Sequence, residues 1–558
     1  MIRGSLSTHV ISSLGFFSNL KYLSEAGYFD VASHEKWLLH TWSLSVEWQF
    51  YIFFPIILRC VWALKPGREF QVKTISIFFL ISFLFCVDLT ISQSSRAFFL
   101  LQARAWEMLG GGLVLLFGKD MVLSSTSRRW FEMCGFILIA TSILVFDANS
   151  TWPGWRALVP VAGAMMVLMA ERSSIITGNS IVQWLGDRSY SVYLWHWPIF
   201  VALTYAEIQG KPLAAIYGIG LTLIIGNFSY LLVERNGRQL FRLAGLNFVG
   251  GSAFVLIFVV ALSAFTIRSF NGVSDRFPPS IELVADEANN INPRRKECNG
   301  NIGPTSPSCI FGGKEWKVIA IGDSHVAATI SGLVAASTNP DSGVVQWSYS
   351  ACPFVPGVRY KTEMLSQFAD GFQCEGFIEW AERKLEKISG DVSVVLIGRY
   401  AQMALGHNED HLSVDVPQVF FTKPYSISTP EFLEEFGRHI TESACKLAKQ
   451  RTVYMMRPIP EMGFDVPKAT SRRMDFGLEE EESITLDDYF KRNAWVWAAQ
   501  DAARSQCGVR ILDPIPYLCH DGRCYGSHDG RPIYSDDDHL SEFGNKLLIP
   551  MFRAVFSN

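Results

Sequence analysis

The stretch Val-Ile-Ala-Ile-Gly-Asp-Ser-His, residues 318–325, decides the fold of the second half of this chain. An apolar run that ends in Gly-Asp-Ser-His is typical of a buried strand that enters a tight turn and presents a serine. Near the C-terminus, Ser-Asp-Asp-Asp-His-Leu-Ser at 535–541 places Asp536 three residues before His539. We therefore predict a catalytic set in which Ser324 is the nucleophile, His539 the base and Asp536 the carboxylate that orients the base.

Strand-like and helix-like patterns alternate between these two motifs. The alternation predicts a parallel sheet with helices on both faces, in which active sites lie at the carboxyl ends of the strands. Ser324 follows the first strand and the loop of Asp536 and His539 precedes the last helix, so both are expected at one edge of the sheet. The expected strands are 317–322, 343–349, 392–398, 452–456 and 509–513, and the expected helices are 325–337, 374–389, 430–449, 485–505 and 541–556.

Chemistry at an activated serine also needs an oxyanion hole, and loss of one donor typically lowers the rate by ~10²–10³-fold. The candidate donors are the backbone N–H of Ser324 and the side chain of Arg399, which ends the third expected strand. The alternative is that Gly-Asp-Ser-His is only a turn and that 536–538 is a solvated acidic run. The occurrence of both motifs at opposite ends of one alternating domain favours the catalytic interpretation.

Apolar residues are concentrated in the first half of the chain, in blocks close to the ~20 residues that a helix needs to span a bilayer. The whole chain is 49% hydrophobic and only 18% charged. We expect no cleavable signal peptide at the start of the sequence, and a net charge of −4 without a basic-aromatic stripe does not favour a nucleic-acid partner. The predicted spans are 40–64, 74–93, 99–118, 130–147, 154–171, 190–208, 213–233 and 249–267, with a weaker stretch at 8–20 as a ninth candidate.

Lysine and arginine indicate the orientation of these spans, because they accumulate in cytoplasmic loops. One set of alternate loops holds twelve of them, and the other holds only Lys21, Lys36, Arg96 and Lys211. The first set is expected in the cytoplasm, so the last span exits on the far side and the C-terminal domain is extracytoplasmic. We predict a membrane domain at 1–267, a linker or covering segment at 268–297 and a soluble domain at 298–558.

Cysteine usage agrees with this orientation. Eight of the eleven cysteines lie in the soluble part, and an even number in an exported domain indicates disulfides. The sequence leaves the connectivity open, and free buried thiols are the alternative. Pairing of neighbours would give Cys298–Cys309, Cys352–Cys374, Cys445–Cys507 and Cys519–Cys524.

Four polar residues in the predicted spans are functional candidates, because ionisable side chains are costly inside a bilayer. Arg104 and Glu107 are three residues apart and can pair on one helix face. Glu47 lies in the span that starts at residue 40, and His196 lies among tryptophans in another span. The alternatives are structural: helix–helix pairing for Glu47 and Arg104, and simple packing for His196.

Together these motifs resemble the membrane acyltransferase-3 family with a fused SGNH hydrolase domain. The resemblance covers nearly the whole chain. It implies a multi-pass α-helical membrane domain followed by an extracytoplasmic α/β domain with αβα layers. It rests on Trp42-Ser-Leu-Ser-Val-Glu47 with Gln49-Phe50-Tyr51, on Arg104-Ala-Trp-Glu107, on Tyr190-Ser-Val-Tyr-Leu-Trp-His196-Trp-Pro198, and on Gly322-Asp323-Ser324 with Asp536-x-x-His539.

The resemblance implies an O-acyltransferase of the bacterial inner membrane with its C-terminal domain in the periplasm. The membrane half would accept acyl groups from cytoplasmic acyl-CoA, acetyl-CoA or another, and pass them outward. Ser324 would then move the acyl group to a sugar hydroxyl of an envelope glycan, above all lipopolysaccharide O-antigen. No bound cofactor and no metal are expected. The alternatives are a peptidoglycan O-acetyltransferase, a membrane-tethered glycan O-acetyl esterase and a non-enzymatic transporter or scaffold.

The sequence departs from the family pattern in several places. Trp48 stands where the family usually has Glu, Arg399 follows a strand that normally supplies an Asn, and no second-block glycine is clearly placed around 350–353. The family's first span carries a basic residue and, eleven positions later, a histidine regarded as the base of acyl transfer. Arg3 and His9 are too close together to match, so we expect this chain to begin at the family's third span. A truncated product, a misassigned start and one half of a split protein are the alternatives.

Overall fold

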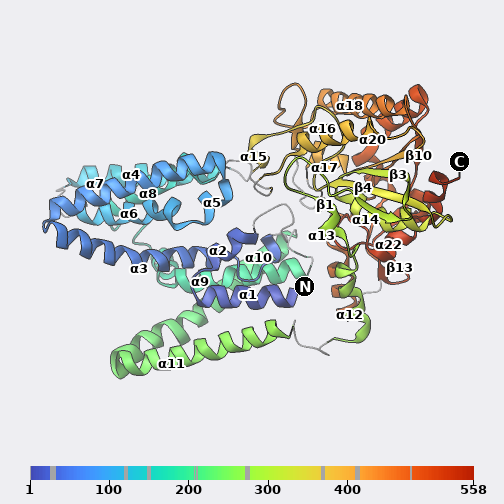
Figure 1. Cartoon of the computed structure of the whole chain (residues 1–558). Coiled ribbons are helices and arrows are strands. Elements are labelled where there is room, and N and C mark those ends of the chain that lie inside the picture. Colours follow the sequence, from blue (N-terminus) through green and yellow to red (C-terminus); the bar gives the residue numbers. More distant parts are fainter. Residues whose placement is uncertain are drawn as a thin grey trace. The chain divides into compact units, whose positions relative to one another are not determined.

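The computed structural model of the chain describes residues 2–25, 33–118, 123–146, 152–206, 208, 211–270, 277–365, 368, 371–406, 408, 415–477 and 481–557 (Figure 1). The chain divides into two units, Met1–Val273 and Ser274–Asn558, each of which is described by itself. The first unit is helical, and the second contains a sheet covered by helices.

The first unit places a helix at each of the eight predicted spans. Among the described residues, four segments are long and apolar enough to cross a membrane: Thr41–Leu64, Arg68–Ser92, Pro212–Gly237 and Gly251–Ser269. The helices are α1 (Ile2–Leu14), α2 (Ser18–Glu25), α3 (Thr41–Leu64), α4 (Arg68–Ser92), α5 (Ser94–Phe99), α6 (Leu101–Gly118), α7 (Ser125–Val145), α8 (Leu158–Ala170), α9 (Ser180–Tyr205), α10 (Pro212–Ser229) and α11 (Asn236–Ser269), with short turns η1 (Ser33–Glu35), η2 (Gly154–Ala157) and η3 (Tyr230–Arg235).

The weak ninth candidate at 8–20 is not one continuous span. Helix α1 ends at Leu14 and α2 begins at Ser18, and Phe16 between them has a left-handed backbone with φ of 54°. An α-helix rises ~1.5 Å per residue, so neither short helix crosses a bilayer on its own. The prediction of a span at this position is therefore wrong.

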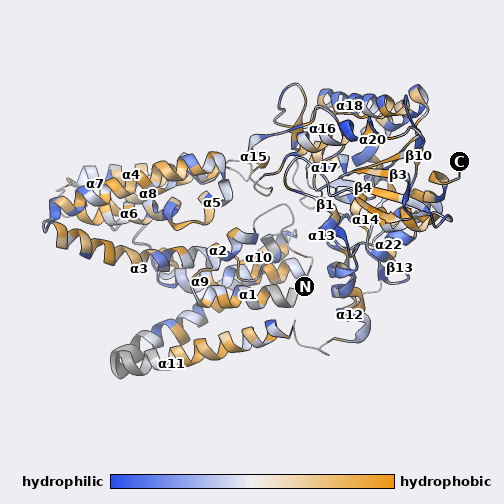
Figure 2. Ribbon diagram, in the orientation of Figure 1, coloured by the Kyte–Doolittle hydropathy of each residue, from blue (hydrophilic) through white to orange (hydrophobic). Residues whose placement is uncertain are grey.

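Apolar residues predominate along α3, α4, α7 and the C-terminal part of α11, as the colouring of Figure 2 shows. Leu144 on α7 is 85% exposed, which suits a surface in contact with lipid rather than water. Helices α7 and α8 approach closely at a pair of glycines. A Cβ on Gly135 would lie 2.7 Å from the Gly163 carbonyl oxygen, and small residues permit such contacts between membrane helices.

The second unit contains all five predicted strands, side by side and parallel, in the order β4-β3-β6-β8-β10. Two short strands, β1 and β2, pair with β4 at the edge, β1 parallel and β2 antiparallel. The sheet comprises β1 (Asn299–Gly300), β2 (Cys309–Gly312), β3 (Glu315–Gly322), β4 (Ser342–Tyr349), β6 (Ser393–Ile397), β8 (Val453–Met456) and β10 (Arg510–Leu512). Smaller pairings join β5 (Arg359–Tyr360) to β7 (Val419–Phe420), β12 (Arg523–Tyr525) to β9 (Ser483–Thr485) and β11 (Cys519–His520), and β13 (Ser527–His528) to β14 (Arg531–Pro532).

The connection rules assign the helices to the two faces of this sheet. The chain passes from β3 through α14 to β4 on one side of β3. It then crosses back through α16, α18 and α20 to β6, β8 and β10 on the other side. Because such crossovers are right-handed, α14 lies on the opposite face of the sheet from the other three helices (Figure 1). The helices are α12 (Pro279–Asp286), α13 (Arg295–Cys298), α14 (Ser324–Ala335), α15 (Thr362–Leu365), α16 (Cys374–Leu385), α17 (Tyr400–Leu405), α18 (Pro430–Ala448), α19 (Val466–Asp475), α20 (Leu486–Cys507), α21 (Ile515–Leu518), α22 (Glu542–Lys546) and α23 (Ile549–Phe552).

The last predicted helix, 541–556, is broken into α22, α23 and a terminal turn. Pro550 has no N–H to donate to the turn before it, which disfavours a continuous helix through this position. The two short helices still cover the sheet, because Leu548 and Phe552 are fully buried in the same core as Ile330 and Leu333 of α14. The C-terminal segment thus closes the face of the sheet on which Ser324 begins its helix.

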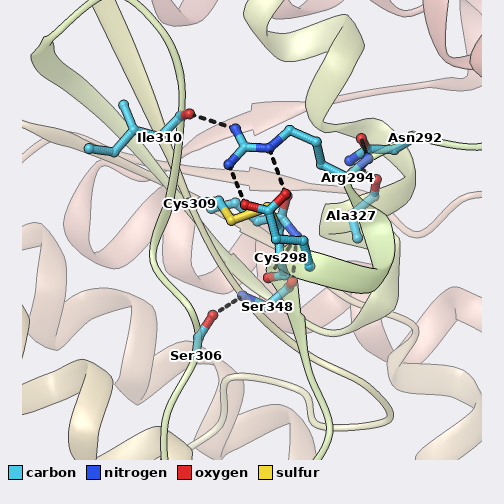
Figure 3. The surroundings of a disulfide bond; sticks show 10 residues. Asn292, Arg294, Cys298, Ser306, Cys309, Ile310, Ala327 and Ser348 are labelled. Atoms are coloured by element: carbon cyan, nitrogen blue, oxygen red, sulfur yellow. Dashed lines mark hydrogen bonds and ion pairs between the residues drawn. A yellow bond between two sulfur atoms is a disulfide. The ribbon is translucent and has the colours of Figure 1, made fainter.

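All four disulfides predicted by neighbour pairing are present, Cys298–Cys309, Cys352–Cys374, Cys445–Cys507 and Cys519–Cys524. Figure 3 shows the first of them, where it joins the segment before the sheet to β2. Arg294 donates to the Ile310 carbonyl at 3.0 Å, and Asn292 donates to the Ala327 carbonyl of α14 at 3.2 Å. The described part of the predicted linker, 277–297, therefore lies on the second unit as a covering segment.

Candidate active site

Strand β3, which lies between β4 and β6, leads into the turn that presents the serine. Gly322 ends β3 where a Cβ would lie 1.7 Å from the Ile397 carbonyl oxygen of β6, so only glycine fits this crossing. The Asp323 carboxylate then accepts the backbone N–H of His325 at 2.9 Å and that of Arg399 at 2.6 Å. These bonds cap α14 and fasten the turn to the end of β6, so that Ser324 stands at the carboxyl edge of the sheet.

The structure brings the three predicted catalytic residues together. Ser324 Oγ lies 2.7 Å from His539 Nε2, and His539 Nδ1 lies 2.9 Å from Asp536 Oδ2. The other oxygen of Asp536 accepts the backbone N–H of His539 at 2.7 Å. The three-residue spacing thus lets one carboxylate hold both the ring and the backbone of the histidine. Ser324 and His539 are buried, 3% and 4% exposed, while the side chain of Asp536 is 36% exposed.

Two further residues, Asp538 and His325, belong to the site, although they were not among our candidates. Asp538 Oδ1 lies 2.9 Å from His539 Nδ1, at the same distance as Asp536. Its other oxygen lies 2.9 Å from His325 Nε2 and 2.8 Å from Arg399 Nη1. Both residues lie inside the quoted motifs, but in the sequence His325 is only the end of a turn and Asp538 is only part of an acidic run. Only the convergence of the two loops reveals their contact.

Arg399 lies differently from our prediction. We expected its side chain to donate to an oxyanion, but the guanidinium is engaged with the carboxylates of Glu461 at 2.7 Å and Asp538 at 2.8 Å. Its backbone N–H is held by Asp323. Glu461 is itself shared with Arg492 at 3.0 Å and is 2% exposed. Arg399 therefore anchors the loops of the site, and no sequence signal pointed to Glu461.

The segment after β4, at 350–353, is the region in which the sequence did not clearly place the family's second-block glycine. Ser350 donates its N–H to the Gly300 carbonyl and Cys352 donates to the Tyr349 carbonyl. Ala351 between them is 2% exposed and has a left-handed φ of 55°, which is unusual for a residue with a Cβ. The Cys352–Cys374 disulfide fixes this turn beside the strand that carries the serine.

The charges around His539 favour its protonated form. Burial lowers the pKa of His539, but the carboxylates of Asp536 and Asp538 outweigh this effect and raise it to about 10. Burial likewise opposes ionisation of Asp538, yet Arg399 and His539 hold the pKa of that carboxyl well below its usual range. Against its own burial, Glu461 has a pKa lowered to about 2 by Arg399 and Arg492. A resting imidazolium follows, and the base form of His539 becomes more abundant as the pH rises.

The candidate residues of the first unit form two groups. Arg104 and Glu107 pair at 3.1 Å on α6, as their spacing predicted, and the guanidinium of Arg104 lies over the Trp42 ring of α3. The second group joins α3 to α9. His196 donates from Nδ1 to the Tyr193 carbonyl at 2.5 Å, and its ring packs 5.8 Å from that of His40.

Tyr193 ties this second group to the start of α3. Its hydroxyl donates to the His40 carbonyl at 2.6 Å and lies 2.6 Å from Ser43 Oγ. Glu47 is half-buried one turn further along the same helix. His40 is the first residue of the predicted span 40–64 but was not a candidate, and its position just before the helix was the available signal. The two groups share α3 but involve different partner helices.

Two family profiles match the chain. One is described as an acyltransferase domain and matches residues 7–268, and the other is described as an SGNH domain fused to AT3 domains and matches residues 295–554. Together they match nearly all of the chain. The chain is thus a membrane protein in which an acyltransferase domain precedes an SGNH domain.

Several curated proteins are similar to part of the chain. The putative membrane-bound transacylase BcsY of Komagataeibacter xylinus is 26% identical over 42% of this chain and 60% of its own length. The putative peptidoglycan O-acetyltransferase YrhL of Bacillus subtilis is 27% identical over 40% of this chain and 38% of its own length. The O-acetyltransferase OatA of Staphylococcus aureus is 25% identical over 40% of each protein. The match thus spans less than two thirds of each relative.

One solved structure also matches, the periplasmic domain of a lipopolysaccharide acetyltransferase from Salmonella ser. Paratyphi A. It is 16% identical and covers 45% of this chain and 86% of the solved chain, with a TM-score of 0.29. A TM-score this low carries no argument about function.

Proposed function

We propose that this chain, which belongs to the acyltransferase family with a fused SGNH domain, is an O-acyltransferase that esterifies hydroxyl groups of a bacterial envelope glycan. The observation that carries the proposal is the buried contact between Ser324 Oγ and His539 Nε2 at 2.7 Å, with Asp536 behind the ring. A base within hydrogen-bond reach is what turns a serine hydroxyl into a nucleophile. The family match supports acyl groups as the cargo.

The reaction proceeds in two steps, acylation of Ser324 and transfer of the acyl group to the glycan. Ser324 Oγ attacks the carbonyl carbon of the acyl donor while neutral His539 takes the hydroxyl proton, and the bond to the donor's leaving group breaks as His539 returns the proton to it. A glycan hydroxyl then attacks the acyl-serine, again losing its proton to His539. The new ester leaves, and the proton restores Ser324. The N–H groups of Ser324 and Ala351 are the donors we propose for the oxyanion that forms in each step.

We further propose that the donor is acyl-CoA, acetyl-CoA or another, on the cytoplasmic side of the inner membrane. Glu47, Arg104, Glu107 and His196 would serve the passage of the acyl group through the first unit. The four disulfides of the second unit support a periplasmic position, because such bonds persist in oxidising compartments. The basic loops of the first unit support the same orientation.

For the acceptor we propose lipopolysaccharide O-antigen, with peptidoglycan as the second glycan to examine. The same serine would hydrolyse esters if water, rather than a sugar hydroxyl, reached the acyl-serine. Sugar attack and water attack give opposite results in cells: transfer raises the O-acyl content of the glycan, and an esterase lowers it. The direction of the change therefore separates the two activities.

The test compares cells that express the wild-type chain, Ser324→Ala or the control Ser505→Ala. Ser505 is an exposed serine at the end of α20 whose hydroxyl bonds only a local carbonyl. O-acyl groups released from purified lipopolysaccharide and peptidoglycan are quantified. We expect O-acylation in wild type and the control, and its loss in Ser324→Ala. Equal acylation in all three strains would overturn the role of Ser324, and lower acylation in wild type than in Ser324→Ala would identify an esterase.

A further inference from the structure

The Nδ1 atom of His539 faces two carboxylates, whereas a serine–histidine–aspartate triad needs one. Asp536 Oδ2 and Asp538 Oδ1 both lie 2.9 Å from it. An imidazole carries a single hydrogen on Nδ1, so the two oxygens share or compete for one donor. The carboxylates differ in their surroundings: the side chain of Asp536 is 36% exposed and that of Asp538 is 3% exposed.

Two other side chains bind the carboxylate oxygen of Asp538 that does not face His539. Its Oδ2 receives His325 Nε2 at 2.9 Å and Arg399 Nη1 at 2.8 Å, which leaves Oδ1 for His539. Arg399 is fixed in turn by Glu461 at 2.7 Å. The position of Asp538 is thus set by groups from the start of α14, the end of β6 and the loop after β8. Asp536, in contrast, is held mainly by backbone N–H groups of its own loop.

We propose that Asp538 is a second positioning carboxylate for His539, shared with His325 and Arg399, so that the base is held by two carboxylates of unequal burial. This inference rests on the proposed function, because it describes how the base of that reaction is oriented. His325 is a positioning residue that acts through Asp538, and its ring lies 4.8 Å from that of His539. Neither residue touches the acyl group.

The surroundings assign different weights to the two carboxylates. Electrostatic interactions strengthen where water is excluded, but buried Asp538 shares its charge with Arg399 and His325, and Asp536 raises the pKa of His539 more than Asp538 does. Removal of either carboxylate should leave the other on Nδ1, and the correct tautomer should persist. Removal of both should leave the ring without an orienting acceptor.

The test uses the purified full-length chain in detergent with 4-nitrophenyl acetate, an activated ester that reports acylation of Ser324 without a glycan. Asp536→Asn, Asp538→Asn, the double variant and the control Asp529→Asn are compared. Asp529 lies close to the same loop with its side chain 93% exposed. Loss of a lone triad aspartate lowers kcat by ~10⁴-fold. We expect that each single variant loses ~10²-fold or less, that the double variant loses ~10⁴-fold, and that KM stays unchanged.

A pH profile separates positioning from a merely structural role. Each carboxylate raises the pKa of His539, Asp536 more than Asp538, so each single variant should move the acid limb of kcat/KM to lower pH, and Asp536→Asn should move it further. Asp536→Asn as inactive as the double variant, or Asp538→Asn with the wild-type pH profile, would overturn the inference. If Asp538→Asn does not fold, His325→Gln keeps both carboxylates and should lower kcat several-fold with KM unchanged, and wild-type kcat in His325→Gln would contradict our account.

The proposed function and this inference fail in different ways. Probe hydrolysis that persists in Ser324→Ala would remove the basis of the proposed function. Probe hydrolysis that depends on Ser324 but not on Asp538 would leave the function intact and remove only the second carboxylate.

Discussion

The serine site of the second unit and the Arg104–Glu107 pair of the first unit hold their charged residues in different ways. In the second unit, Asp538 has three partners from separate elements, and every one of them is buried. In the first unit, Arg104 finds its carboxylate three residues away on its own helix. A network that joins several elements fixes a reacting geometry, whereas an ion pair within one helix does not by itself tie that helix to its neighbours. The comparison teaches that the second unit is built as a rigid site.

The largest effect is expected from the base itself. His539→Ala should lower kcat for 4-nitrophenyl acetate by ~10⁴-fold or more with little change in KM, because loss of a triad base removes the proton acceptor of both steps. His520→Ala is the matched control, since this ring is 63% exposed, pairs with its neighbour Asp521 and stacks on Tyr525. Activity of His539→Ala within tenfold of the control would break the claim that the second unit contains the rigid reacting site.

The next largest effect is expected from loss of a disulfide, which should lower the stability of the second unit but not that of the first. Cys445 and Cys507 close a loop of 62 residues, and replacement of both by Ala should lower the free energy of unfolding of the second unit by about 4 kcal/mol on the chain-entropy model. The same change at Cys519 and Cys524, which are 5 residues apart, should cost only about 2 kcal/mol.

Denaturant titrations that follow the two units by limited proteolysis provide this measurement. Cys60, Cys86 and Cys134 of the first unit are free, so a reductant should destabilise the second unit and leave the first unchanged. Equal sensitivity of both units to reductant would contradict this.

Arg399 tests the buried network with an effect of similar size. Arg399→Ala leaves Glu461 and Asp538 without their shared cation, and a broken buried pair typically costs about 3–5 kcal/mol. Arg383→Ala removes an exposed arginine that pairs with Glu379, and this should change stability by less than about 1 kcal/mol. Urea unfolding followed by tryptophan fluorescence measures the difference. Equal stability of the two variants would show that the network does not stabilise the site.

The pH dependence of the reaction should be steep on the acid side. His539 must be neutral to accept a proton, and its pKa is raised to about 10, so kcat/KM should rise ~10-fold per pH unit below that value. Rates with 4-nitrophenyl acetate, corrected for the uncatalysed reaction, measure this between pH 6 and pH 10. A rate that already levels off near pH 6 would mean that the two carboxylates do not act on the imidazole as their distances indicate.

The smallest effect concerns packing in the first unit. Gly135→Ala places a Cβ 2.7 Å from the Gly163 carbonyl oxygen, and overpacking of this kind typically costs about 1–3 kcal/mol. Gly111→Ala is the control, because nothing lies within 4 Å of the added Cβ. Thermal inactivation in detergent should be faster for Gly135→Ala only. Equal rates would show that α7 and α8 can slide apart without loss.

Much of the second unit could be predicted because its signals are local. Each parallel strand is a short apolar run, and Ser324, Asp536 and His539 lie in motifs of a few residues. Each disulfide joins two cysteines that follow one another among the cysteines of the second unit. The break in the last helix could also have been predicted, because the sequence contains Pro550 within the expected helix.

The rest of the site depends on contacts between distant segments. Asp538 and Arg399 are far apart in the sequence with several strands between them, and their pairing exists only because the sheet brings two loops to one edge. The same holds for Glu461, which looks like an ordinary charged loop residue in the sequence. Periodicity and spacing report which residues share an element, but not which loops converge.

The central claim is that Ser324 carries the acyl group, and peptide mapping tests it most directly. The purified full-length chain is treated with 4-nitrophenyl acetate, quenched in acid and digested, and acetylated peptides are located by mass spectrometry. The account predicts an acetyl ester on Ser324 in the wild-type chain, none in Ser324→Ala and far less in His539→Ala. An unmodified Ser324 in a chain that turns over the ester, with the acetyl group on another side chain, would contradict it.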